Sequence, residues 1–332
     1  MEQKQKRILN DVVVMRVILV ALLILYHSFA PFSGNWDPIY SFDSPVYFWI
    51  GKFGYSFFLE AFVFISGLLA GYQFVAGGGN SKIYDGKFVL KKAKRLLLPS
   101  VVFSVIYFAC FYKWEGSVAF IRSILDGCGH MWFLPMLFWC FVCLWLMSKI
   151  NMHPYWLLAF AFFLTFAYNG LLPLRIGRAF YYFFFFLLGY FVHQGYMKKI
   201  LDTRWAVIIT LAAVFVVSYV ACIEVHFHIV VSRLLRTLSA FCGLTACYLI
   251  VLRFIPKDGV ALPRWMIVIS RYSFGIYILQ QFVLQAIYYN TSLPLVVDYI
   301  LTPWIGVLLA FVLSFAGTHL MLKTRVGRFL VG

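Results

Sequence analysis

Long apolar runs recur from one end of the chain to the other, and this feature constrains the fold more than any other. Each run is about as long as a helix that crosses a bilayer, which needs roughly 20 residues. Backbone groups in lipid must be satisfied within the segment, and the alternation typical of barrel strands is absent from the sequence, so the runs are predicted to be helices. We expect an all-α polytopic membrane bundle of about ten helices. The predicted spans are 12–31, 54–75, 96–112, 131–148, 155–172, 179–194, 205–222, 234–252, 266–289 and 300–322.

Composition excludes the soluble classes. Of the 332 residues, 63% are hydrophobic and 12% are charged, whereas an average soluble domain has about 25% charged residues. The net charge of +16 would suggest nucleic acid in a soluble protein, but here it is better explained by basic loops on the cytoplasmic side. The pair Cys140 and Cys143 lies inside an apolar run, which favours packing over redox or metal chemistry. We expect no nucleic-acid partner and no metal site.

The distribution of basic residues predicts the orientation. With the N-terminus in the cytoplasm, 20 of the 28 basic residues fall in inner segments and 7 in outer ones, and Arg16 lies within the first span. This is a strong positive-inside bias. It predicts that both termini are cytoplasmic and that residues 1–332 form one transmembrane domain in the cytoplasmic (inner) membrane, with a composition typical of bacteria.

Two ionisable residues share one face of the first span. Arg16 and His27 are eleven residues apart, which in a helix is about 20° past three full turns and about 16 Å along the axis. Taken singly, Arg16 is explained by snorkelling to the inner interface, and His27 by a neutral position near the outer interface. Their common stripe makes a functional pair the better interpretation, because ionisable groups inside a membrane are costly.

Glu60 is the only acid deep in an apolar run, and the topology gives it a depth comparable to that of His27. A carboxylate there either orients His27 and raises its basicity or neutralises a buried arginine. The simplest form of the second alternative is a structural ion pair between Glu60 and an arginine within the bundle.

Several motifs now resemble a known family. An arginine and a histidine separated by ten residues in the first helix are the hallmark of membrane-bound acyltransferase family 3. Four further segments resemble family elements in the same order along the chain: FVFISGLL (62–69), KKAKRLLLPS (91–100), GHMWFLPMLF (129–138) and SRYSFGIYILQ (270–280). One departure stands out, because the family commonly has histidine where this chain has Gln280. Glutamine can donate and accept hydrogen bonds at this position but cannot take up a proton. The soluble esterase-like domain that some members have is also missing from this sequence.

The resemblance implies a reaction and its donor. Such enzymes move an acyl group, usually acetyl, from cytoplasmic acyl-coenzyme A to a hydroxyl, often on an envelope sugar. By this resemblance His27 is the general base or carries the acyl group transiently, Glu60 orients it, and Arg16 holds part of the entering donor. Acyl-coenzyme A is then a co-substrate, with no bound cofactor. The implied donor-binding residues are Arg16, Lys91, Lys92, Lys94 and Arg95, although the last four are also explained by the positive-inside rule alone.

The acceptor side is implied in the same way. His130 is expected to contact the acceptor, and Trp132 either does so too or belongs to the aromatic belt at the interface. Four arginines oppose the charge trend on the predicted outer side, where they suit an anionic glycan or a lipid-linked sugar: Arg175, Arg178, Arg233 and Arg236. The alternative functions are a transporter or flippase of a glycan unit, for which no inverted repeat is visible, and a structural partner in an envelope complex.

Overall fold

The computed structural model describes residues 9–36, 43–79, 85–150, 152–167, 172–192, 194–196, 204–255 and 261–332. All regular elements within these ranges are helices, and the protein is an all-α polytopic membrane bundle. The longer helices are α1 (Asn10–Ser28), α2 (Pro45–Tyr55), α3 (Phe58–Ala76), α4 (Gly86–Phe111), α6 (Phe133–Met147), α7 (Pro154–Leu164), α8 (Ile176–Val192), α10 (Trp205–Glu224), α11 (Ile229–Phe254), α12 (Arg264–Gln285) and α14 (Thr302–Lys323). The shorter elements are α5 (Ser117–Asp126), η2 (Gly129–Trp132), η3 (Thr165–Ala167), η4 (Pro173–Arg175), η5 (Ala286–Asn290), α13 (Leu293–Val296) and α15 (Arg325–Val331).

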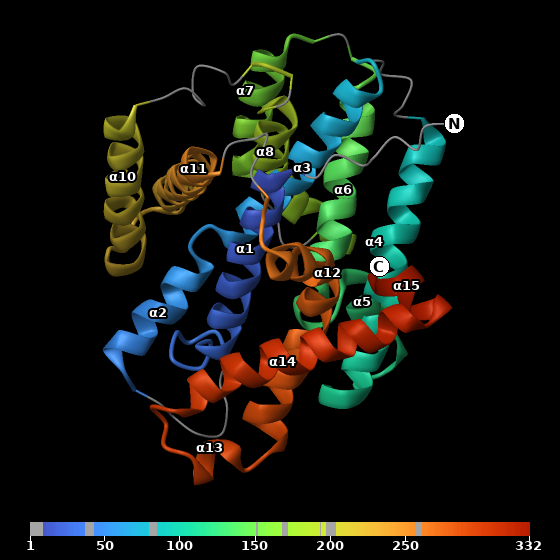
Figure 1. Cartoon of the computed structure of the whole chain (residues 1–332), viewed down its shortest axis with the longest axis vertical. Helices are drawn as coiled ribbons and strands as arrows, with labels where there is room; N and C mark the ends of the chain where they lie inside the picture. Colours follow the sequence, from blue (N-terminus) through green and yellow to red (C-terminus); the bar gives the residue numbers. More distant parts are fainter. Residues whose placement is uncertain are drawn as a thin grey trace.

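Helix α1 runs through the bundle, and α10 and α11 lie side by side at one edge, on the left of Figure 1. Helices α14 and α15 pack against α12 and complete another side. The core is continuous and aromatic, and α1, α3, α6 and α8 supply most of its buried side chains. Polar groups brought into this core by α1 therefore lie deep inside protein.

Each predicted span coincides with a helix. Within the described ranges, eight helical stretches are long and apolar enough to cross a membrane. The other two predicted spans correspond to α7, which η3 extends to Ala167, and to α8, which has 17 residues. Residues 168–171 and 193 of these two spans lie outside the described residues. So do seven of the basic residues that were assigned to the inner side: Lys4, Lys6, Arg7, Lys82, Lys198, Lys199 and Lys257.

Three helical segments differ from the sequence-based expectation. The second span is preceded by α2, which begins at a Ser44 cap with proline in its first turn and is separated from α3 by the bend at Ser56 and Phe57. The basic stretch before the third span is helical, because the Asp85 carboxylate accepts a hydrogen bond from Phe88 N at 2.8 Å and starts α4 there. Helix α5 was not predicted, because it is short and amphipathic.

Close helix approach explains the small residues of the second span. Gly67 in α3 and Gly189 in α8 face each other's helix backbones, and a Cβ at either one would overlap a carbonyl oxygen, that of Phe186 or of Phe64. Helices in lipid associate through such backbone proximity. The contact fixes α3 against α8 beside the site described next.

The end of α1 that carries His27 is held on two sides. The Ser28 carbonyl accepts a hydrogen bond from Tyr288 in η5 at 2.7 Å, and the Ser28 hydroxyl donates to the Pro303 carbonyl at the start of α14. Gly306 of α14 leaves space for this serine. These contacts fix the rotation of the last turn of α1, and with it the direction of the His27 side chain.

Candidate functional site

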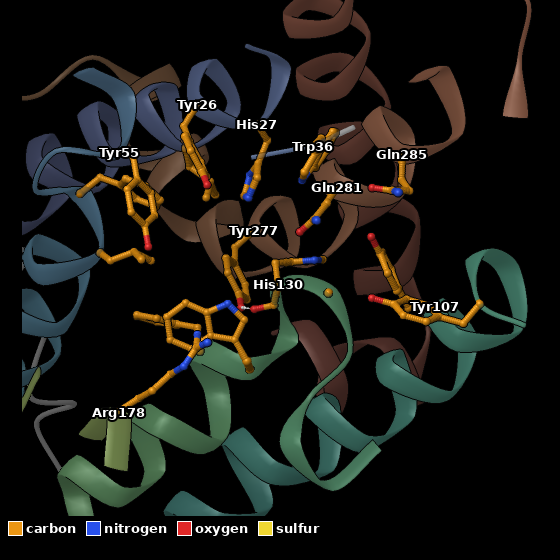
Figure 2. Close-up of a pocket in the computed structure, with 17 residues that line it drawn as sticks. Tyr26, His27, Trp36, Tyr55, Tyr107, His130, Arg178, Tyr277, Gln281 and Gln285 are labelled. Atoms are coloured by element: carbon orange, nitrogen blue, oxygen red, sulfur yellow. Dashed lines mark hydrogen bonds between the residues drawn. The ribbon is translucent and has the colours of Figure 1, made fainter. Parts of the chain in front are cut away.

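A cavity of about 330 Å³ contains both histidines that the sequence singled out. His27 of α1 and His130 of η2 line it, with ring centroids 6.2 Å apart. In Figure 2, His27 and Arg178 enter the space from opposite sides of the view, with Tyr277 and His130 between them. We call this space the histidine cavity. Its walls are mainly aromatic, so polar chemistry is confined to a few side chains.

His27 is 6% exposed and has a defined partner. Gln280 of α12 places its amide Nε2 at 3.0 Å from His27 Nδ1, and the Gln280 Oε1 is buried without a partner. In this arrangement the amide donates to Nδ1, so the proton of a neutral imidazole is on Nε2. A half-turn of the amide would let Oε1 accept a hydrogen bond from Nδ1–H and leave a lone pair on Nε2. The orientation of the Gln280 amide and the tautomer of His27 are therefore coupled.

His130 is also buried and is fixed by α12. Its Nε2 donates to the Ile278 carbonyl at 2.9 Å, and its own carbonyl accepts a hydrogen bond from the Tyr277 hydroxyl. A carbonyl can only accept, so the proton is on Nε2 and Nδ1 has a free lone pair. That Nδ1 is buried and has no partner. His130 therefore lines the histidine cavity and keeps one buried ring nitrogen as an unused acceptor.

A second cavity, of about 240 Å³, lies at the level of Arg16 on α1. Arg16, Lys92 and Arg95 line it, and we call it the arginine-16 cavity. The two cavities share Phe133 of α6 and Tyr277 of α12 as a common wall. The predicted stripe on α1 therefore faces two adjoining spaces, one basic and one with histidines.

The basic segment of α4 faces a third and larger space, of about 840 Å³. Lys91 and Lys94 line it together with Arg328 of α15, and Lys92 and Arg95 lie between it and the arginine-16 cavity. Both cations pack on aromatic rings: Lys92 Nζ is 4.0 Å from the ring centre of Phe141, and Arg95 Cζ is 5.3 Å from that of Phe274. The four predicted donor-binding cations thus lie together, next to Arg16.

Glu60 is not brought to His27. It is 2% exposed and accepts a hydrogen bond from the Tyr181 hydroxyl at 3.1 Å, and Arg236 of α11 is the cation that acts on it electrostatically. No contact of the described residues joins Glu60 to His27, whose Nδ1 partner is Gln280 instead. The structure therefore does not place Glu60 where it could orient His27, and the other expectation, neutralisation of an arginine, describes its surroundings.

The predicted acceptor residues separate into two groups. Trp132 and Arg178 line the histidine cavity and stack on each other, with Arg178 Cζ 4.2 Å from the ring centre of Trp132. Arg175 lines neither cavity and instead donates from Nε to the Asp126 carbonyl at 3.0 Å. Arg175 is therefore tied to the end of α5, whereas Arg178, His130 and Trp132 are in reach of a bound molecule.

Two polar residues of the site were missed or left without a role. Gln281 lines the histidine cavity with its Oε1 buried and unpartnered, and Gln280 carries the contact to His27. The signal was present, because two consecutive glutamines interrupt an otherwise apolar run. Intramembrane polar groups are functional candidates by the same argument that selected Arg16.

Other chemistries find little support among the described residues. No group of three or more metal-ligating side chains is found there. Cys128 lies two residues from His130, but burial raises the pKa of its thiol to about 11, so it stays protonated at neutral pH and is a poor nucleophile.

Similarity to one protein family covers nearly the whole chain. The family model for an acyltransferase domain matches residues 9–322, nearly the whole chain. No curated protein and no solved structure matches it. The match includes α1 with Arg16 and His27, the basic start of α4, η2 with His130, and α12 with Gln280. The chain belongs to membrane-bound acyltransferase family 3.

Proposed function

We propose that this membrane acyltransferase moves an acyl group, acetyl in the simplest case, from cytoplasmic acyl-coenzyme A to a hydroxyl of an exported or envelope glycan. One observation carries the proposal. The stripe on α1 faces a basic cavity at Arg16 and a histidine cavity at His27, and the two share Phe133 and Tyr277 as a wall. About 16 Å of helix separates the two residues, a distance suited to a donor arm that enters from one side.

The donor side is argued from charge. Coenzyme A carries phosphates at one end and its thioester at the other. Lys91, Lys94 and Arg328 line the large basic space beside α4, and Arg16 lines the adjoining arginine-16 cavity. Phosphates would bind to the former cations, and the pantetheine arm would extend past Arg16 toward the shared wall. Phosphate binding would explain why the start of α4 is basic, in addition to the effect of its charges on membrane orientation.

The acceptor side is argued from proton chemistry. His27 Nε2, with Gln280 Oε1 turned toward Nδ1, removes the proton of the acceptor hydroxyl as the oxygen attacks the thioester carbon. The carbon–sulfur bond breaks, coenzyme A leaves as the thiolate and takes up the proton, and an ester remains. In the alternative route Nε2 attacks first, and an acyl-histidine passes the group on. Both routes need the same nitrogen and the same orientation by Gln280.

The test uses purified protein in lipid with radiolabelled acetyl-coenzyme A and a crude envelope glycan fraction. We expect coenzyme A release and labelled glycan from the wild type, loss of both in His27→Ala, and weaker donor binding in Arg16→Ala. His319→Ala is the matched control, because His319 is exposed on α14 and contacts Tyr272 outside the three cavities. An inert wild type, with other acyl donors also inert, would contradict the proposal and favour a transporter.

The proposal includes a location. The protein is a multi-pass membrane protein, and the positive-inside bias supports the cytoplasmic membrane of a bacterium with both termini inside. The cavities agree with this orientation in one respect. Lys91, Lys94 and Arg328, which the loop pattern assigns to the inner side, gather at one space, and Arg178 and Arg236, assigned to the outer side, gather at another.

A further inference from the structure

A separate pocket of about 180 Å³ adjoins the histidine cavity. Three arginines line it, namely Arg178, Arg233 and Arg236, and we call it the triple-arginine pocket. It shares Tyr55, Trp132 and Arg178 with the histidine cavity. A molecule in one space is therefore in contact with the wall of the other.

The charges of this pocket do not balance. No aspartate or glutamate is among the described residues that line it. Glu60 lies behind the wall, where it accepts a hydrogen bond from Tyr181 and interacts with Arg236. Among the described residues, Glu60 is the carboxylate that acts on Arg236, and no acidic side chain lines the pocket beside Arg178. An excess of cations in a partly enclosed space attracts an anion more strongly than the same charges do in water.

The arginines are held by contacts that leave hydrogen-bond donors available. Arg178 stacks on Trp132, and its Nε is buried with no partner. Arg236 Cζ lies 5.6 Å from the ring centre of Tyr55 and 5.8 Å from that of Tyr181. Stacking uses the face of a guanidinium, whereas oxyanions bind at its edge. Arg233 is different, because its Nη1 already donates to the Phe166 carbonyl at 2.8 Å.

We propose that the acceptor carries an anionic group, a carboxylate or a phosphate, that binds in the triple-arginine pocket between Arg178 and Arg236. This rests on the proposed function, because it names the chemical class of the acceptor for the same site. Binding the anion at Arg178 places the remainder of the acceptor at the shared wall, so that one of its hydroxyls reaches His27 and His130. Neutral sugars lack this anchor and are poorer acceptors.

The first test needs no turnover. Inorganic phosphate replaces chloride at constant ionic strength, and thermal unfolding of the protein in detergent is followed. We expect phosphate to raise the melting temperature of the wild type and to bind about tenfold more weakly to Arg178→Gln, the usual order for losing a charged hydrogen-bonding partner. Arg122→Gln, on the exposed face of α5, keeps the wild-type response. Arg178→Lys keeps the charge without the fork and falls between.

The second test asks what the acceptor is. Glycan labelled by the wild type is separated on an anion exchanger, before and after carboxyl reduction or removal of phosphate. We expect the label in the acidic fraction, and about tenfold less labelling of this fraction by Arg178→Gln. Whichever pretreatment abolishes labelling identifies the group as carboxylate or phosphate.

The outcomes separate the two proposals. Label only in neutral glycan, or a phosphate response that survives in Arg178→Gln, would overturn the anionic acceptor and leave the acyltransferase reaction standing. Absence of label from both fractions would overturn the proposed function, and the acceptor role of the pocket with it. Each variant is compared first in chloride alone, so that a loss of folding is not mistaken for a loss of the anion site.

Discussion

The two cavities along α1 are built in different ways, although they share a wall. In the arginine-16 cavity, Lys92 and Arg95 rest on aromatic faces. In the histidine cavity, each imidazole has a hydrogen-bond partner that fixes its ring: Gln280 for His27 and Ile278 O for His130. Proton transfer needs a fixed tautomer. The difference supports the proposal that the donor binds on one side of the wall and that the chemistry takes place on the other.

The largest effect is expected from removing the base. His27→Ala should lower kcat by about 10²- to 10⁴-fold, the usual contribution of a positioned general base. The affinity for acetyl-coenzyme A should stay the same, because His27 does not line the arginine-16 cavity. Steady-state kinetics and equilibrium binding of labelled donor measure the two quantities. A comparable loss of donor binding in His27→Ala would contradict the assignment of donor binding and base catalysis to separate cavities.

The next effect is expected from the residue that orients the base. Gln280→Leu removes the partner of His27 Nδ1, and we expect kcat to fall by about 10- to 100-fold, as for other groups that orient a functional imidazole. Gln280→Glu should keep most of the activity, because its carboxylate accepts a hydrogen bond from Nδ1–H and leaves Nε2 as the base. Rates across a pH series compare the three proteins. Equal losses in both variants would show that Gln280 only fills space.

A smaller effect, on a different parameter, is expected at the donor side. Arg16→Gln should raise KM for acetyl-coenzyme A about tenfold and change kcat little, because a charged hydrogen-bonding partner is lost without touching the base. The effect should change little with salt, since Arg16 lies inside the bundle and buried charges are screened much less than exposed ones. Arg122→Gln is the control for a general change of charge. A fall in kcat with unchanged KM would assign Arg16 to the chemical step.

The smallest effect is expected at the shared wall. Tyr277→Phe keeps the ring but removes the hydroxyl that donates to the His130 carbonyl, worth about 1 kcal/mol. We expect transfer to glycan to fall by about fivefold or less and hydrolysis of acetyl-coenzyme A to rise, because a looser wall admits water. The ratio of labelled acetate to labelled glycan measures this. An unchanged ratio would argue that Tyr277 does not separate the two spaces.

The sequence predicted the long apolar helices and the common face of Arg16 and His27 on α1, because both depend on local periodicity. The direction of the Glu60 side chain and its contact with Tyr181 depend on how α3 packs against α8 and α11. The sequence of a single span does not contain this information. The same holds for Gln280, whose contact with His27 joins residues 253 positions apart. The helical start of α4 was a local feature, since Asp85 is a recognisable cap, but the basic run behind it was interpreted as a loop. The positions of the apolar helices along the chain were therefore predictable, whereas side-chain pairing across helices was not.

We propose that the acyl donor reaches the shared wall from the cytoplasmic side and the glycan reaches it from the opposite side. Sided membrane vesicles can test this arrangement. Inside-out vesicles receive labelled acetyl-coenzyme A outside, with glycan enclosed in the lumen. The account predicts labelled glycan in the lumen, abolished by His27→Ala, and little labelling of glycan placed on the same side as the donor. Equal labelling of glycan on the donor side would contradict it.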